Sequence, residues 1–229
     1  MTINYRAIRA ARGGTKDMPY RAGLVAWYRY RYGIINTNGN CTRWRDQSGN
    51  GNDLVQDTAS LGPAVQSDGS LLFNGSSQYM QATFTLNQPA TIFMAFTQVS
   101  WTNNNVILDG KTAQAQLIQT SSTPQITVNA GSALTADATI PVGSRGVCAV
   151  VFNNTASSYV AGGGAATVTT SGTAGSNNLG GFTLGAARTP ASYSNIQVRE
   201  VAIFNQAYTA DQILKNLRYF ARVGQVGGV

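Results

Sequence analysis

Residues 198–217, VREVAIFNQAYTADQILKNL, contain a β-strand pattern followed directly by the pattern of an amphipathic helix. In the segment TADQ, Thr209 and Gln212 form a capping box, in which each side chain can satisfy the backbone amide of the other residue. We therefore expect one C-terminal helix, ending near Arg222, that packs its apolar stripe on a β-structure. The apolar residues at helical spacing are Ile213, Leu214, Leu217 and Phe220.

Short β-strand patterns fill the chain upstream of this helix, and turn residues separate nearly every pair of them. Hydrophobic residues make up 43% of the 229 residues and charged residues only 11%, which suits short strands joined by turns and does not suit a disordered chain. This rhythm predicts a sandwich or a barrel. We predict one all-β domain over residues 23–229, preceded by a basic arm over residues 1–22. The expected strands cover residues 24–34, 70–75, 79–86, 91–99, 105–110, 115–120, 125–130, 146–153, 157–162, 166–172, 182–187 and 196–205.

The order of these segments resembles the laminin-G-like, concanavalin A-like lectin/glucanase domain. The resemblance covers residues 24–222 and implies a two-sheet antiparallel jelly-roll sandwich with one short C-terminal helix. Near Gly146 the chain has Gly-Val-Cys, where members of the family often have Trp. The matching segments are LVAWYRYRYG, WRDQSGNGNDLVQ, LLFNGSSQYM, TIFMAF, GVCAVVFNNTASSYVAGG, FTLGAA and the closing strand and helix.

Glucanases of this superfamily use two closely spaced carboxylates, one as nucleophile and one as acid/base. This chain has a single glutamate, Glu200, between apolar Val198 and Val201, with no acidic residue within six positions. We interpret it as a surface residue or an ion-pair partner, of Arg199 or of a basic residue across the sheet. Histidine is absent, which removes the usual general base. We therefore predict that the chain is not an enzyme.

Sugar binding, the best-known activity of the family, needs an exposed aromatic ring surrounded by amide and carboxylate groups. In the segment SWTNNN, Trp101 is flanked by Asn103, Asn104 and Asn105 and is followed by Asp109. These five residues are the candidate carbohydrate site. The alternative is a loop tryptophan that packs over a sheet edge.

A polar loop offers the oxygen ligands that calcium prefers, and no other cofactor is expected. Its candidate ligands are Asp46, Asn50, Asn52 and Asp53. The alternative is a tight irregular turn, in which Asp46 accepts backbone hydrogen bonds and the intervening glycines adopt conformations that other residues resist.

The two cysteines, Cys41 and Cys148, do not have the spacing of a metal or redox motif. Cys148 lies in GVCAVVF, which has the pattern of a buried strand, so a core position is expected. We predict two free thiols, with a disulfide as the alternative.

The formal charge is +7, and seven of the sixteen basic residues fall within the first 31 positions. Such a segment attracts an acidic partner. Its basic residues are spaced out and no nucleic-acid-binding motif accompanies them, so we expect no nucleic acid. We expect the arm to order only against a partner, through Arg6, Arg9, Arg12, Lys16 and Arg21.

The sequence contains no signal peptide and no membrane-spanning segment. Low charge, the arm and a domain without partner modules favour a virion structural protein, made in the host cytoplasm. It would be a capsid decoration or a tail or adhesin component of a tailed phage, homo-oligomeric and bound to capsid or tail proteins. The alternative function is a lectin-like module that recognises a cell-surface glycan.

Overall fold

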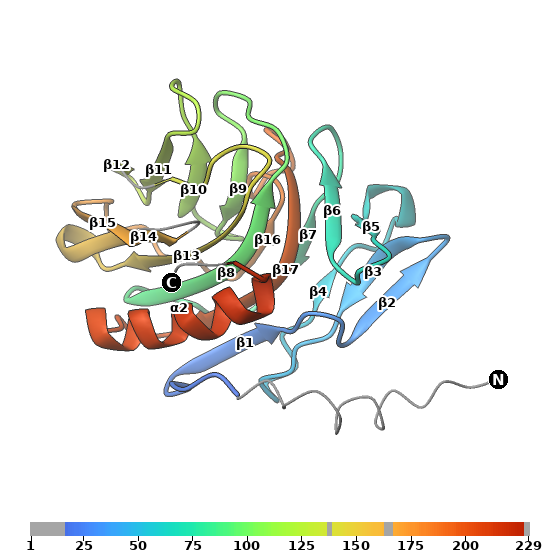
Figure 1. Ribbon diagram of the computed structural model, residues 1–229, viewed down its shortest axis with the longest axis horizontal. Helices are drawn as coiled ribbons and strands as arrows, with labels where there is room; N and C mark the ends of the chain where they lie inside the picture. Colours follow the sequence, from blue (N-terminus) through green and yellow to red (C-terminus); the bar gives the residue numbers. More distant parts are fainter. Residues whose placement is uncertain (1–16, 137–138, 163–166, 227–229) are drawn as a thin grey trace.

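The computed structural model describes residues 17–136, 139–162 and 167–226. This part of the chain is mostly antiparallel β-structure with one C-terminal helix, α2 (Ala210–Gly224) (Figure 1). The strands are β1 (Leu24–Tyr28), β2 (Ile34–Thr37), β3 (Asn40–Trp44), β4 (Leu54–Val55), β5 (Ala64–Val65), β6 (Leu71–Asn74), β7 (Met80–Ala82), β8 (Ala90–Gln98), β9 (Val106–Asp109), β10 (Gln116–Gln119), β11 (Ile126–Asn129), β12 (Ala133–Ala136), β13 (Arg145–Phe152), β14 (Ser157–Gly162), β15 (Thr167–Gly172), β16 (Phe182–Leu184) and β17 (Asn195–Phe204).

Hydrogen bonds join all seventeen strands into one sheet, where we expected two separate sheets. One part has β17 at its centre, with β8, β13, β14 and β15 on one side and β1 and β6 on the other. The second part runs from β12 through β11, β10, β9, β16, β7 and β4 to β3 and β2. The two-residue strand β5 pairs with both β3 and β6 and connects the parts.

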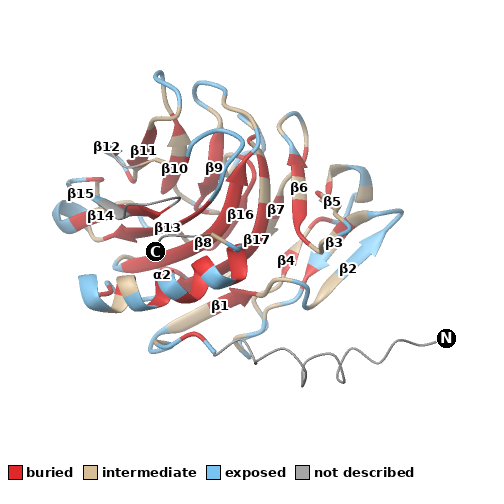
Figure 2. Ribbon diagram, in the orientation of Figure 1, coloured by how far each residue is buried: buried red, intermediate tan, exposed pale blue. Residues whose placement is uncertain are grey.

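The curved sheet encloses an inner core, to which both parts contribute. Phe96 and Val198 come from the first part, and Leu117 and Val128 come from the second. Figure 2 shows the buried strands surrounding this core.

Both cysteines are buried and free, which confirms the prediction of two thiols. Burial raises the pKa of the Cys41 and Cys148 thiols to about 12 each, so both stay protonated at neutral pH.

Helix α2 covers the other face of β8, β13 and β17 and forms an outer core with it. Phe220 stacks on Phe93 of β8 with ring centroids 5.6 Å apart, and Leu217 is fully buried in the same cluster. The predicted capping box is confirmed: Thr209 accepts from the amide of Gln212, and the Gln212 side chain accepts from the Thr209 amide at 2.9 Å. No helix in the described part of the chain is long and apolar enough to span a membrane.

A β-bulge in β17 controls where its charged residues point. Val198 pairs with Phe96 and Glu200 pairs with Ala95, so Arg199 is the extra residue on the bulged strand. Because the bulge shifts the alternation by one residue, Glu200 faces the outer core instead of following Val198 into the inner core.

The prediction that Glu200 is a surface residue is wrong, since it is only 2% exposed. Its carboxylate accepts hydrogen bonds from Trp27 Nε1 at 2.8 Å, Tyr219 Oη at 2.7 Å and the Tyr30 amide at 3.1 Å. It therefore links β1 and α2 to β17. Its neighbour Arg199 is not its partner, because that guanidinium pairs with the Asp68 carboxylate at 2.8 Å.

Replacement of the helix cap should destabilise the fold by a predictable amount. We expect Thr209→Ala to lower the free energy of unfolding by about 0.5–2 kcal/mol, the usual cost of losing an N-cap side chain. Urea unfolding measures this change. Thr37→Ala, at an exposed position of β2, is the matched control and should change the stability by less than about 0.5 kcal/mol. Equal stability of the two variants would contradict a stabilising cap.

Burial raises the pKa of the Glu200 carboxyl above its ordinary value, although three hydrogen bonds and Arg29 oppose the shift. The folded protein therefore binds this proton more tightly than the unfolded chain does. This contribution to stability should decline as pH rises from about 4.5. Glu200→Gln removes the ionisation, so the stability of the variant relative to wild type should improve between pH 4.5 and pH 8 in denaturant titrations. A pH-independent difference would show that the buried carboxyl does not titrate in this window.

Candidate functional site

The loop between β8 and β9, residues 99–105, carries the predicted carbohydrate-binding residues. The Ser100 amide donates to the Asn195 carbonyl at 3.3 Å, and the Val106 amide, just after the loop, donates to the Ser192 carbonyl at 2.7 Å. The loop is therefore held at both ends by one short stretch of chain that leads into β17.

The middle of this loop is fixed by Gln119 at the end of β10. The Gln119 side chain donates to the Ser100 carbonyl at 3.0 Å and accepts from the Thr102 amide at 3.2 Å. The Asn104 amide donates to the Gln119 carbonyl at 2.8 Å, and Asn104 adopts a left-handed backbone conformation with φ of 68°. Asparagine tolerates this conformation better than most residues do. The loop thus presents its side chains from a backbone that is already ordered.

Four of the five predicted sugar-binding residues lie together on this loop. Asn103 and Asn104 are exposed, and Trp101 and Asn105 are half-buried. Among the described residues, the side-chain amides of the three asparagines have no hydrogen-bond partner, and Trp101 Nε1 is buried without one. Unpaired amides can both donate to and accept from a ligand.

The structure separates the fifth residue, Asp109, from this loop. Asp109 ends β9, so about 10 Å of strand lies between it and the loop. Its carboxylate is fully buried and accepts four hydrogen bonds, which come from the amides of Gly110, Ala115 and Arg188 and from the Gln116 side chain. Burial raises the pKa of this carboxyl, while the four donors oppose the shift.

Two tyrosines that the sequence pattern does not single out lie beside this loop. Tyr193 lies between Ser192 and Asn195, whose carbonyls hold the two ends of the loop, and it forms a parallel β-bridge with Val106. The ring of Tyr79 approaches it, with centroids 6.3 Å apart. Their segments, SSQYM and ASYSN, also combine an aromatic ring with serine or asparagine. This composition is the only feature of the sequence that indicates these tyrosines as sugar-binding candidates. They are too far apart in the chain to be paired from sequence.

The four predicted calcium ligands lie in one loop, but the carboxylates are already engaged. Asp46 Oδ1 accepts from the Trp27 amide at 2.8 Å, and Asp53 Oδ1 accepts from the Asp46 amide at 2.8 Å. Asn50 and Asn52 donate through Nδ2 to carbonyls of β1. These contacts are the ones expected of a tight irregular turn, the alternative to a calcium site. Within the described ranges, no group of three or more acidic or thiol side chains could hold a metal ion. Calcium binding stays a prediction.

The predicted arm is described only at its C-terminal end, residues 17–22. Met18 is buried there, and the Tyr20 amide donates to Asn216 Oδ1 of α2 at 3.0 Å. Arg21, expected to contact a partner, pairs with Asp17 at 2.9 Å. The remaining predicted contact residues, Arg6, Arg9, Arg12 and Lys16, lie outside the described residues.

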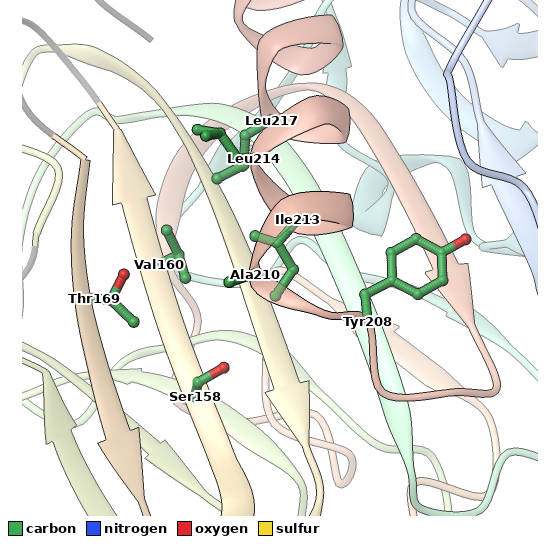
Figure 3. Close-up of a pocket in the computed structure, with 8 residues that line it drawn as sticks. All are labelled: Ser158, Val160, Thr169, Tyr208, Ala210, Ile213, Leu214 and Leu217. Atoms are coloured by element: carbon green, nitrogen blue, oxygen red, sulfur yellow. The ribbon is translucent and has the colours of Figure 1, made fainter.

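A pocket of about 380 Å³ lies between α2 and the strands β14 and β15 (Figure 3). Its polar groups are three hydroxyls, and that of Tyr208 already donates to the Ala22 carbonyl at 3.0 Å. The pocket therefore offers less hydrogen bonding to a sugar than the loop between β8 and β9. Its lining consists of Ser158, Val160, Thr169, Tyr208, Ala210, Ile213, Leu214 and Leu217.

No family model matches the chain, and no curated protein matches its sequence. Solved structures do share its fold. Domain 4 of AbnA, a GH43 extracellular arabinanase from Geobacillus stearothermophilus in complex with arabinotriose, matches with a TM-score of 0.60 at 15% identity over 86% of this chain and 98% of that domain. Trypanosoma rangeli sialidase in complex with sialic acid matches with a TM-score of 0.61 at 15% identity, over 90% of this chain and 34% of the sialidase. A GH54 α-L-arabinofuranosidase matches with a TM-score of 0.61 at 12% identity, over 89% of this chain and 60% of that chain.

These matches correct the prediction that the chain is not an enzyme, because these three structures come from glycoside hydrolases. Identities of 12–15% show the fold alone. The chain spans nearly the whole arabinanase domain, but only about a third of the sialidase and three fifths of the arabinofuranosidase. The predicted virion role gains no support from these structures.

Proposed function

We propose that this chain is a carbohydrate-binding domain, with its site on the rim formed by the loop between β8 and β9. The observation that carries the proposal is Trp101 beside three asparagines whose side-chain amides are unpaired within the described chain. Two comparisons support it. The resemblance to laminin-G-like, concanavalin A-like lectins implies sugar binding, and a domain of similar fold has been solved with arabinotriose.

The chemistry of the rim suits a sugar. The C–H groups on one face of a sugar ring pack on an aromatic ring, and the exposed amides of Asn103 and Asn104 can donate to and accept from hydroxyls. Because Gln119 already fixes the loop, binding does not need to order the backbone. A site that is ordered in advance loses less conformational entropy on binding.

The virion hypothesis depends on different parts of the chain. Its attachment residues are mostly those of the arm, and residues 1–16 lie outside the described part of the structure. The ordered loop between β8 and β9, with its unpaired amides among the described residues, favours the glycan function. We adopt glycan binding as the proposed function.

Trp101→Ala should weaken binding to immobilised oligosaccharides by about tenfold or more, since an aromatic contact at the centre of a site contributes about 1.4 kcal/mol or more. Glycan-array screening followed by calorimetry on the best neutral ligand, with arabinotriose as the first probe, measures this loss. Asn103→Ala, at an exposed position, should also weaken binding without changing the melting temperature.

Asn36→Ala, an exposed asparagine on β2, is the matched control and should bind as wild type does. Unchanged affinity in both Trp101→Ala and Asn103→Ala would place the glycan site elsewhere. Failure of the wild-type protein to bind any glycan would refute the proposed function.

A further inference from the structure

We infer that the rim extends from Trp101 to a second aromatic position made by Tyr193 and Tyr79, so that it takes a neutral oligosaccharide chain rather than a single terminal sugar. This inference rests on the proposed carbohydrate-binding function.

The first step is the position of Tyr193 relative to the Trp101 loop. The Asn195 carbonyl accepts from the amide of Ser100, which precedes Trp101, and the Ser192 carbonyl accepts from the Val106 amide beyond the loop. Tyr193 lies between these two attachment points. The loop and this tyrosine are therefore neighbours on one rim, with the three asparagines between Trp101 and the bridge of Val106 with Tyr193.

The second step is the order of the tyrosine pair. Tyr193 Oη donates to the Pro190 carbonyl at 3.0 Å, which fixes its ring. The Tyr79 amide donates to the Leu61 carbonyl at 3.1 Å, and Asn74 Oδ1 closes the preceding turn by accepting from the amides of the two residues after Gly75. Both rings are half-buried, and their planes are inclined by 45°. They form a second stacking surface on ordered backbone.

The third step is charge, which decides between neutral and acidic ligands. The segments that carry Trp101, Gln119 and the two tyrosines contain no charged residue; they are residues 74–79, 98–105, 119–125 and 192–195.

The basic residues between positions 69 and 195 are Lys111, Arg145 and Arg188. Lys111 donates to Gln81, and Arg145 donates to Gln225 Oε1 at 2.8 Å. The Arg188 guanidinium pairs with the buried Asp109 carboxylate at 3.9 Å. Asp137, which lies outside the described residues, is acidic and would not attract an anionic sugar. An anionic sugar would therefore lose hydration on this rim and meet only cations that already have partners, although the whole chain has a pI near 9.7.

The test compares ligand length with aromatic deletions in the full chain. Calorimetry uses arabinose, arabinobiose and arabinotriose, with the gluco- and xylo-oligosaccharides of the same lengths. In wild type we expect the affinity to rise at least fivefold from one sugar to three. In Tyr193→Ala and in Tyr79→Ala this rise should disappear while the monosaccharide affinity stays unchanged. Tyr193→Phe keeps the ring and should retain the rise. Tyr32→Ala, at an exposed tyrosine just before β2, is the matched control.

Charge is tested with lactose against sialyllactose, and with 50 against 500 mM NaCl. We expect lactose to bind at least as tightly as sialyllactose. The affinity for lactose should change less than about twofold between the two salt concentrations. Equal wild-type affinity for one sugar and for three would overturn the two-position rim. So would a loss of affinity for ligands of every length in both tyrosine variants. Preference for sialyllactose that salt abolishes would overturn the neutral ligand. If no sugar binds the wild-type protein, the proposed function fails together with this inference.

Discussion

The strand pair β8–β17 is buried on both faces, and the rest of the architecture follows from that. All nine residues of β8 are buried, so this pair needs a cover on each side. The second part of the curved sheet covers the inner core, and α2 covers the outer core. Because α2 and residues 17–22 occupy the outer face, the ordered loops between β8 and β9 and between β10 and β11 lie away from them. Figure 1 shows these loops at the top of the view, and α2 and β1 at the bottom.

The bulge in β17 separates charge from the binding rim. It turns Glu200 under α2 and leaves Arg199 beside Asp68, so both buried charges have partners at the α2 and β1 end of the molecule. The aromatic contacts of Arg21 and Arg29 with Trp27 lie at the same end. In strands β7, β9, β10, β11, β12 and β16, Asp109 is the only charged residue. The net charge of the chain is therefore a poor guide to the ligand of the rim.

Features that depend on local contacts were predicted correctly from the sequence. The capping box in TADQ, the helix stripe and the hydrogen bonding of Asp46 within its turn join residues a few positions apart. Features set by distant contacts were missed. The run LVAWYRYRYGI has the composition of one strand, but β1 ends at Tyr28, because the Tyr30 amide binds Glu200 and Arg31 adopts a φ of 65°. The sequence pattern indicates a surface position for Glu200, since its partner Trp27 is 173 positions away. Likewise, only folding brings Tyr79 and Tyr193 beside the Trp101 loop.

The most direct measurement of the central claim is a nuclear magnetic resonance titration of isotope-labelled protein with arabinotriose. If the rim is the glycan site, the largest shift changes will be those of the Trp101 indole N–H and the side-chain amides of Asn103, Asn104 and Asn105, while signals from α2 stay in place. Changes confined to the pocket between α2 and β14, or to residues 1–22, would contradict this account.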